Sequence, residues 1–278
     1  MREGSSPGSI AAAYLAACEL DVTALKPGNV RDGAPFDDMT AGDFRASAAA
    51  SAPVLAGEDG GDAAVGSVVR RAIEATRRVV QCNTNLGIVL LAAPLCIAAR
   101  RGVPARSAVE RQLAGLTRAD ASEAYAAIRA AAPGGLGQRP RHDVADEPQV
   151  TLREAMCEAA ADDRIAAQYC SGYADVFDFG VPAWRDGLAR FGDERRAASW
   201  LYMQIVAAFD DSHVVRRHGS AVASEVRAYA RTLVVHGGPR DSDLAAWDTQ
   251  LRGRRVNPGT SADLTVAVVL AAKLALTV

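Results

Sequence analysis

The sequence predicts an all-α fold, a single domain of about a dozen helices over residues 1–278. Apolar residues recur at helical spacing along most of the chain. No convincing run alternates between apolar and polar residues with a period of two, as a half-buried strand would. Aromatic residues make up only 5 % of the chain, so alanine, leucine, valine and isoleucine must fill the core. Small aliphatic side chains of this kind favour closely packed helices.

The expected helices follow from this periodicity and from residues typical of helix ends. They span residues 9–25, 40–54, 61–81, 86–101, 105–116, 118–131, 151–171, 182–189, 193–209, 220–236, 242–251 and 258–277. We expect Ser9 to cap the first helix, Thr40 the second and Asn257 the last. Residues 133–148, rich in proline and glycine, are the one clear irregular connection, which either divides two lobes or covers a site. The pair Val234-Val235 is the only short segment with β character.

Charge and cysteine content exclude several classes of function. The 31 basic and 33 acidic residues leave a net charge of −2, so there is no broad basic surface for nucleic acid or anionic membranes. The longest apolar runs fall short of the ~20 residues that span a bilayer, and the N-terminus does not match a secretory signal. The 5 cysteines include no Cys-x-x-Cys pair. We therefore expect a cytoplasmic protein whose cysteines are reduced thiols.

Polar segments interrupt the apolar background at helix ends. A turn at residues 26–31 follows the first helix, and its Lys26 and Asn29 either face a phosphate or hydroxyl or simply end the helix in solvent. Asp37 and Asp38 are adjacent carboxylates in front of the second helix. A Mg²⁺ ion between them would relieve their repulsion, and an acidic first helical turn is the alternative.

Two further helix starts carry polar side chains. Asn83 and Asn85 precede the most apolar helix, and they either cap it or hold a ligand. One amide is enough for the cap, which leaves the other to explain. Residues 257–264 begin the last helix with hydroxyls and backbone donors, a composition suited to an anion. Asp263, in the same turn, is expected to be a partner of the helix dipole, a ligand or a base.

Residues 210–219 form the richest polar segment, with acids, histidines and arginines within ten residues. If the segment is helical, Asp211 and His213 lie on neighbouring faces. The carboxylates could hold a metal ion, and Arg216 or Arg217 could bind phosphate oxygens. A salt-bridged surface turn is the alternative.

Taken in chain order, these segments resemble the triphosphoribosyl-dephospho-CoA synthase family. The resemblance covers nearly the whole chain and depends on the order of the segments more than on any single one. Its segments are Lys26-Pro27-Gly28-Asn29-Val30, Asp38-Met39 with Phe44 and Ser47, Asn83-Thr84-Asn85-Leu86-Gly87, Asp211-Ser212-His213, and Pro258-Gly259-Thr260-Ser261-Ala262-Asp263-Leu264. The resemblance implies an all-α fold and a reaction that joins ATP to 3′-dephospho-CoA with loss of adenine.

Such a reaction needs Mg²⁺ and cations for the triphosphate, a carboxylate base, and a proton donor or hydrogen bonds for adenine. By the resemblance, Asp38, Asp211 and Asp263 are the candidate catalytic carboxylates, and Asp37, Asp38 and Asp211 are the candidate Mg²⁺ ligands. His213 either protonates the departing adenine or is a buried structural histidine. The candidate substrate-binding residues are Lys26, Asn29, Asn83, Asn85, Arg216, Arg217, Asn257, Thr260 and Ser261.

Three positions depart from the family pattern. Phe36 and the pair Asn85-Leu86 replace a histidine and a His-Lys pair, and Leu152-Arg153-Glu154 is a remnant of a longer Gly-x-Arg-Gly-Glu segment. The chain is therefore similar to a divergent branch associated with methanogens and methylotrophs. Alternative functions are another ATP-dependent transferase or kinase in the biosynthesis of a methanopterin-type coenzyme, N-glycosidic hydrolysis, or non-catalytic binding. Alanine-rich helical lobes also make a homodimer plausible.

Overall fold

The computed structural model describes residues 5–36, 38–61, 63–101, 106–134, 141–235 and 238–275. Over these residues it contains helices and no strand, which confirms the predicted all-α fold. The helices are α1 (Pro7–Thr23), α2 (Ala41–Ala56), α3 (Val65–Val79), α4 (Leu86–Arg100), α5 (Arg106–Ala114), α6 (Arg118–Ala131), α7 (Leu152–Ala159), α8 (Arg164–Ser171), the π-helix η1 (Asp175–Gly180), α9 (Val181–Phe191), α10 (Glu194–Ala208), α11 (Ser212–His218), α12 (Ser220–Val235), α13 (Asp241–Gly253) and α14 (Gly259–Lys273).

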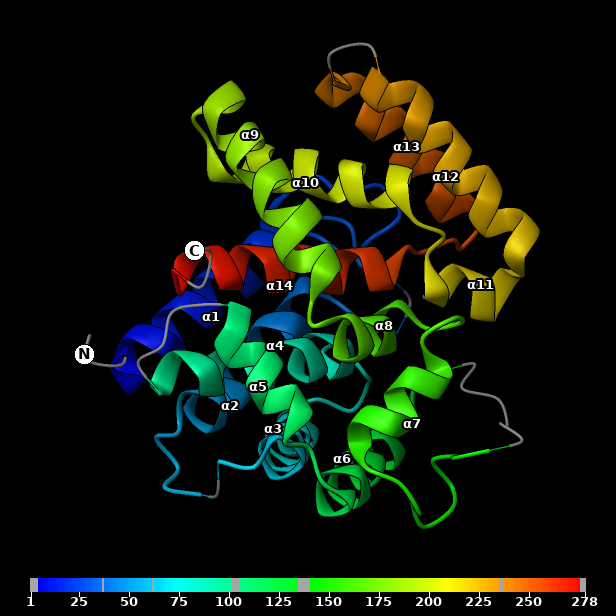
Figure 1. Ribbon diagram of the computed structural model, residues 1–278. Coiled ribbons are helices and arrows are strands. Elements are labelled where there is room, and N and C mark those ends of the chain that lie inside the picture. The colour runs from blue at the N-terminus through cyan, green and yellow to red at the C-terminus, as the bar shows by residue number, and fades with distance from the viewer. Residues whose placement is uncertain are drawn as a thin grey trace.

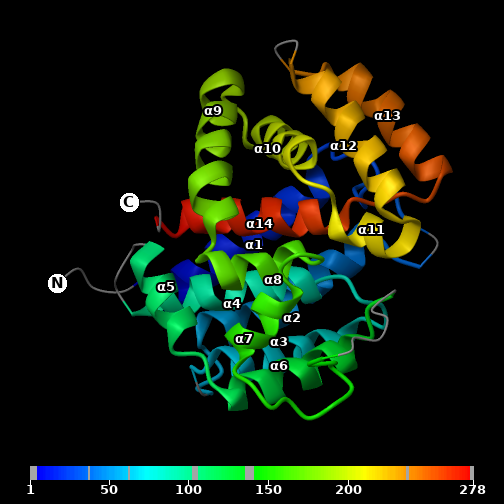
Figure 2. The ribbon, with the colours of Figure 1, turned by 45° about the vertical axis from the view of Figure 1, so that its right-hand side comes forward.

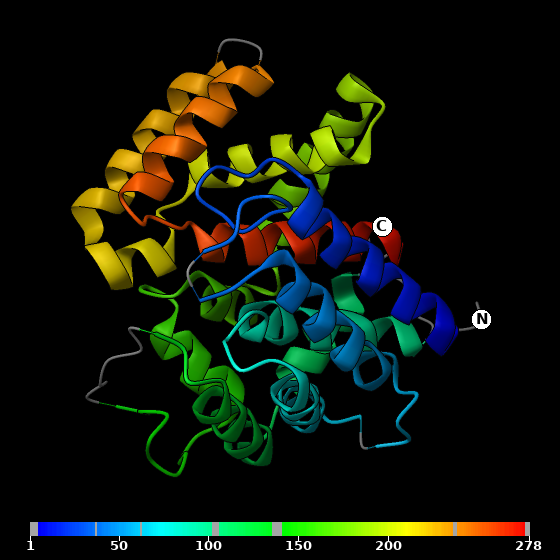
Figure 3. The same cartoon turned by 180° about the vertical axis from the view of Figure 1, so that it is seen from behind.

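The last helix, α14, runs through the middle of the molecule. Helices α2 to α8 lie on one side of it, and α9, α10, α12 and α13 lie on the other (Figures 1 and 2). Seen from behind, α1 runs alongside α14 (Figure 3). Helix α4 packs on α14 as well, and every residue from 86 to 99 except Gly87 is buried. A helix that is apolar on all sides must lie in the interior, so the two most apolar sequence segments form the centre of the fold.

A second, smaller core joins α10 to α11, α12 and α13. It is built around the buried side chains of Trp247, Val226, Met203 and Val256. This core determines where the chain leaves α13, and residues 254–258 then lead directly into the first turn of α14. Both cores therefore position the start of the central helix.

Helix caps agree only partly with the sequence-based predictions. Thr40 caps α2 as expected, in a reciprocal capping box with Asp43. The cap of α1 is Ser6 instead of Ser9, because the Ser9 N–H donates to Ser6 Oγ at 3.2 Å. Asn257 does not cap α14; its Oδ1 accepts a hydrogen bond from Asn29 Nδ2 at 3.0 Å. The pair Val234-Val235 is helical, at the end of α12.

The single helix predicted for residues 151–171 is wrong. Asp163 caps a new helix by accepting from the N–H groups of Ile165 and Ala166, so the chain turns between α7 and α8. The π-helix η1 before α9 was also not predicted, although α11 over the polar segment at residues 212–218 agrees with the helical alternative. Residues 135–140 of the proline- and glycine-rich connection and Asp37 lie outside the described residues.

The expectation that all cysteines are reduced is wrong for two of them. Cys157 of α7 and Cys170 of α8 form a disulfide with their Cα atoms 4.9 Å apart, and Cys18, Cys82 and Cys96 are free thiols. On one continuous helix, residues 13 apart would be separated by about 20 Å. The missed turn between α7 and α8 is thus the reason that the pairing could not be foreseen. Among the described residues, no helix is long and apolar enough to cross a membrane.

Candidate active site

A cavity of about 560 Å³ lies where the first turns of α4, α11 and α14 face α6, α7 and α8. Its volume is in the range of small-molecule sites. Seven of the residues predicted from sequence line its wall: Asn29, Asn83, His213, Arg216, Asn257, Thr260 and Asp263. They come from four segments that are far apart in sequence, so folding brings together much of the predicted polar set.

Asp263 has the least satisfied carboxylate of this wall. No hydrogen bond or ion pair to it occurs within the described part of the chain, and it faces the cavity. Burial raises the pKa of the Asp263 carboxyl well above its usual range. The negative charges of Asp21 and Asp211 act in the same direction, and Lys26 and Arg216 oppose them. A raised carboxyl pKa without a structural partner is typical of groups that exchange protons in catalysis.

Gly87 makes room for Asp263. A side chain at position 87 would collide with the Asp263 carboxylate, and its Cβ would lie 2.8 Å from Cδ1 of Ile165. Both Gly87 and Ile165 line the cavity. The glycine at the start of α4 therefore lets the carboxylate lie directly against the helix.

Lys26 is placed in the interior instead of at the cavity wall. Its ammonium forms an ion pair with Asp21 and donates to Asn29 Oδ1 at 3.0 Å, and the residue is only 1 % exposed. Asn29 in turn donates to Asn257 Oδ1. Lys26 thus orients the two amides of the wall, and the structure does not place it where it would contact a phosphate.

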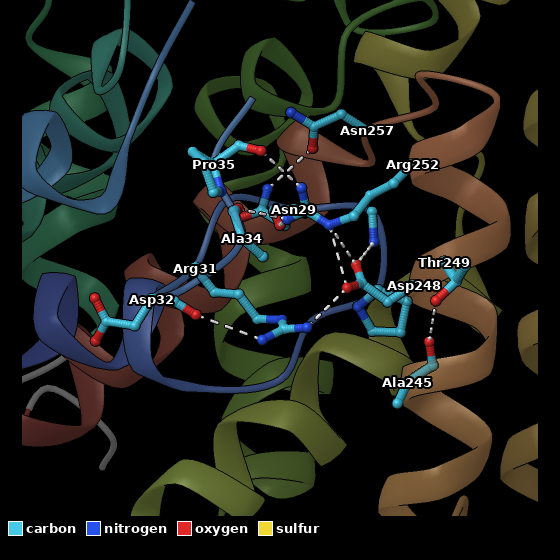
Figure 4. Close-up of polar contacts among 12 residues, drawn as sticks. Asn29, Arg31, Asp32, Ala34, Pro35, Ala245, Asp248, Thr249, Arg252 and Asn257 are labelled. Carbon is cyan, nitrogen blue, oxygen red and sulfur yellow. Dashed lines mark hydrogen bonds and ion pairs between the residues drawn. The ribbon is translucent and has the colours of Figure 1, made fainter. Parts of the chain in front are cut away.

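Hydrogen bonds and ion pairs hold the turn that contains Asn29 against α13 and the segment after it (Figure 4). The guanidinium groups of Arg31 and Arg252 both bind the Asp248 carboxylate, at 2.9 and 3.0 Å. The Gly28 N–H donates to the same carboxylate at 2.8 Å. Gly28 has a φ of 80° and lies against the Val256 carbonyl, so only glycine fits there. These contacts fix one rim of the cavity.

Asp211 does not line the cavity. It caps α11 by accepting from the Val214 N–H at 3.0 Å, and its other oxygen accepts from the N–H and hydroxyl of Ser261 at 2.7 and 2.8 Å. Asp211 is 3 % exposed, and its carboxylate joins the starts of α11 and α14. With both oxygens occupied, Asp211 fits a positioning role better than the expected metal or base role, and the Ser261 hydroxyl is likewise committed to it.

His213 and Thr260 lie side by side at the cavity. The His213 N–H donates to Thr260 Oγ1 at 3.2 Å, and the imidazole lies against Gly259. Burial lowers the pKa of His213; Asp211 opposes that effect, and Arg216, Arg217 and His218 add to it. A neutral imidazole can accept or donate a hydrogen bond in the cavity.

The two asparagines before α4 have different roles. Asn83 lines the cavity, and its Oδ1 accepts from the Leu86 N–H, the first N–H of α4, at 3.2 Å. Asn85 is buried away from the cavity and donates to Thr76 Oγ1 at 3.0 Å. Asn85 therefore holds α3 against α4 and is not available to a substrate.

Two arginines at the cavity form ion pairs with the α7–α8 pair. Arg216 binds Asp163 at 2.6 Å, and Arg141 binds Glu158. Arg217 is exposed and does not line the cavity, and the same holds for Asp38. Across the described residues, no three histidine, cysteine or acidic side chains form a group that could hold a metal ion. Of the expected Mg²⁺ ligands, Asp38 is exposed and does not line the cavity, Asp211 is engaged in hydrogen bonds, and Asp37 lies outside the described residues, so the Mg²⁺ site stays a prediction.

Sequence reasoning missed several residues of the wall. Asp21, five residues before Lys26, was one, although an acid near a buried lysine is a detectable signal. Gly87 and the apolar part of the wall had no signal of their own, because apolar residues at helical spacing are also what a core requires.

The sequence and the fold are both similar to those of known proteins. Residues 7–277 match the model of the CitG family, described as ATP:dephospho-CoA triphosphoribosyl transferase. Over 98 residues the chain is 35 % identical to a protein of Albidiferax ferrireducens described as a probable 2-(5″-triphosphoribosyl)-3′-dephosphocoenzyme-A synthase, covering 34 % of this chain and 32 % of that protein. The match thus spans about a third of this curated relative.

A solved structure from Archaeoglobus fulgidus, a candidate triphosphoribosyl-dephospho-CoA synthase, has a similar fold. The TM-score is 0.65 at 24 % identity, and the superposition covers 82 % of this chain and 97 % of that one. At this identity the likeness concerns the fold alone. Because the family model extends over nearly all of the sequence, the chain belongs to the CitG family of ATP:dephospho-CoA triphosphoribosyl transferases.

Proposed function

We propose that the protein transfers the triphosphoribosyl group of ATP to the 2′-hydroxyl of 3′-dephospho-CoA and releases adenine. The observation that carries the proposal is the Asp263 carboxylate, which has no partner among the described residues and lies on a wall to which the segments around Asn29, Asn83 and His213 also contribute. Family membership supports the reaction class. Small-molecule substrates, a cytoplasmic location and a homodimer belong to the same proposal.

In this reaction the bond between C1′ of the ATP ribose and N9 of adenine breaks, and a bond from C1′ to the acceptor oxygen forms. The acceptor hydroxyl gives its proton to Asp263. Adenine leaves with the electron pair of the broken C1′–N9 bond and takes up one proton from solvent, so no net proton is consumed once Asp263 releases its own. Because its pKa is raised, the Asp263 carboxylate binds a proton more strongly than an exposed carboxylate does, which favours it as the acceptor of the hydroxyl proton. Its negative charge, once formed, would also stabilise positive charge on the ribose.

The other polar groups of the wall are proposed to orient the substrates. Asn29 and Asn257 present amides that their mutual hydrogen bond already fixes. Arg216 can exchange its partner Asp163 for a phosphate oxygen, which is a stronger charge-assisted pairing when bidentate. Mg²⁺ enters this proposal as part of the Mg·ATP substrate, because Asp211, one of its expected ligands, has both oxygens occupied.

The proposal is tested by incubating the protein with Mg·ATP, with and without 3′-dephospho-CoA, and separating adenine, ADP and AMP by chromatography. Adenine that forms only with the acceptor is the expected result. Adenine without acceptor would indicate hydrolysis, and ADP or AMP would indicate phosphoryl or adenylyl transfer. Intact ATP in both reactions would overturn the proposal. Asp263→Asn should lower adenine release at least about 10²-fold, and Asp193→Asn, at the exposed cap of α10 and away from the cavity wall, is the matched control.

A further inference from the structure

The Cys157–Cys170 disulfide closes a segment of the cavity wall. It joins the last turn of α7 to the last turn of α8, with the two Cα atoms 4.9 Å apart, and residues 158–169 lie between them. Half of these residues line the cavity: Glu158, Ala159, Asp162, Asp163, Ile165 and Ala166. The covalent bond and the wall of the candidate active site therefore belong to the same short segment.

The segment is anchored in the core on both sides of its turn. Leu152 and Met156 of α7 and Ile165 and Tyr169 of α8 are buried, and the Tyr169 hydroxyl donates to the Leu90 carbonyl at 2.7 Å. In contrast, residues 157–163, which we call the α7–α8 turn, include none that is buried. The middle of the segment is thus held less firmly than its two sides.

Two ion pairs also hold the α7–α8 turn, and solvent reaches both. Asp163 binds Arg216 at 2.6 Å, and Glu158 binds Arg141. Ion pairs of this exposure contribute little to stability, and helices of eight residues, such as α7 and α8, are not stable on their own. The disulfide is therefore a strong local restraint on the position of the turn.

Solvent also reaches the disulfide. Cys157 and Cys170 are half-buried, whereas the free thiols of Cys18 and Cys96 are buried. Thiol–disulfide exchange requires access to a sulfur atom, and exposed disulfides are the labile ones. In cytosolic proteins, the location proposed above, disulfides are usually transient. These properties fit a reversible bond better than a permanent structural one.

We propose that Cys157 and Cys170 are a reversible thiol–disulfide site, and that its opening loosens the part of the cavity wall formed by the α7–α8 turn. The inference goes beyond the proposed transfer, since the modification does not depend on which ligand the cavity takes. Ile165, at the start of α8, lies against Gly87 beside Asp263. A displaced turn therefore also changes the surroundings of this carboxylate.

The exchange uses two equivalents of a thiol such as glutathione. The first thiolate attacks Sγ of one cysteine, the Sγ–Sγ bond breaks, and the other cysteine leaves as a thiolate. A second thiolate attacks the reductant's sulfur in the mixed disulfide and releases the remaining cysteine. The reductant gives up two electrons and becomes a disulfide, and its two thiol protons end on Cys157 and Cys170. The oxidised reductant reverses the reaction.

Opening the site should weaken ligand binding. A ligand does not have to order a turn that the disulfide already fixes, whereas it must order a loosened turn, and the free energy of that ordering lowers its affinity. We expect the Kd of Mg·ATP to be about tenfold higher in the reduced form. This one consequence rests on the proposed function.

The test places the whole chain in buffers with increasing ratios of reduced to oxidised glutathione. Iodoacetamide labels the free thiols after denaturation, and mass spectrometry of peptides shows whether Cys157 and Cys170 are linked or labelled. We expect the two to change together within the range of ratios, with Cys18 and Cys96 labelled throughout. Amides of the α7–α8 turn should exchange hydrogen at least about tenfold faster in the reduced protein, and those of α4 should not change.

Matched variants separate the disulfide from other effects of the reductant. Cys157→Ser combined with Cys170→Ser should show fast exchange in the turn and the weaker binding of Mg·ATP in every buffer. Cys82→Ser removes a half-buried free thiol and should keep the response of the wild type. If the double variant does not fold, the wild type with and without dithiothreitol gives the same comparison.

Three outcomes decide between the parts of the proposal. A cysteine pair that stays linked, or stays labelled, at every ratio would overturn the reversible site. Conversion without faster exchange in the turn, or with an unchanged Kd of Mg·ATP, would overturn its link to the cavity. A protein that shows the conversion and the faster exchange but binds no Mg·ATP would keep the site and overturn the proposed transfer instead.

Discussion

Two carboxylates near the start of α14, Asp211 and Asp263, have opposite surroundings. Asp211 accepts three hydrogen bonds, two of them from Ser261. Asp263, two residues after Ser261 on α14, has no partner among the described residues and faces the cavity. The first carboxylate completes the fold by satisfying buried donors, whereas the second raises the free energy of the folded state and gains nothing structural in return.

The hydrogen-bond partners of a carboxylate therefore tell a structural aspartate from a catalytic one better than its residue type does. Both residues are aspartates in polar helix starts, and both fit the same sequence-based role. What distinguishes them is the set of hydrogen bonds that each accepts among the described residues. A half-buried carboxylate such as Asp263, without a partner there, is retained where it has a function.

The largest expected effect is that of Asp263→Asn on activity. Removing the proposed base should lower adenine release at least about 10²-fold. The same substitution should raise the melting temperature, because it replaces a poorly solvated carboxyl with a neutral amide of equal size. Steady-state adenine assays and calorimetry measure the two effects. Loss of both activity and stability would mean that Asp263 is structural, like Asp211.

The buried ion pair beside Asp263 should show the next largest effect. Lys26→Met leaves the Asp21 carboxylate unpaired in the interior and should lower the free energy of unfolding by about 3–5 kcal/mol. Lys26→Met with Asp21→Asn should recover part of this loss. As a control, Lys273→Met removes a more exposed pair with Glu194 and should cost about 1 kcal/mol or less. Urea unfolding measures the free energy of unfolding of all three variants. Equal losses for Lys26→Met and Lys273→Met would contradict the claim that the Lys26–Asp21 pair is buried and the Lys273–Glu194 pair is not.

Asp211→Asn should destabilise the protein, with the opposite sign to Asp263→Asn. One carboxylate oxygen becomes an NH₂ group that faces donors, so we expect a loss of about 2 kcal/mol. Asp193→Asn is the matched control: Asp193 caps α10 with a single bond, and asparagine caps as well as aspartate. A stable Asp211→Asn protein would show that the Ser261 contacts are dispensable.

Most of the fold was predictable because helical periodicity is a local property. The positions of α4 and α14 follow from runs that are apolar on every side. The turn between α7 and α8, the π-helix and the Cys157–Cys170 disulfide were not, since each depends on contacts between helices.

The site was predictable as a set of segments but not as a set of roles. Asn29, Asn83 and Asp263 reach the cavity, whereas Lys26 and Asn85 hold the surrounding helices in place. What separates them is a partner from another part of the chain, such as Thr76 for Asn85, and no local pattern encodes that partner.

The smallest expected effect, on the pH dependence of stability, tests the comparison directly. With the folded-state pKa of Asp263 raised, the folded protein binds more protons than the unfolded chain above about pH 4, so this carboxyl makes stability fall as pH rises. His213 has the opposite sign: its pKa is lowered, so stability rises with pH up to about 6.5. Urea unfolding from about pH 4 to pH 8 should show that Asp263→Asn removes the fall and His213→Gln the rise. If the wild type instead gains stability over Asp263→Asn as pH rises from about 4, then Asp263 is stabilised in its ionised form by partners, and the contrast with Asp211 disappears.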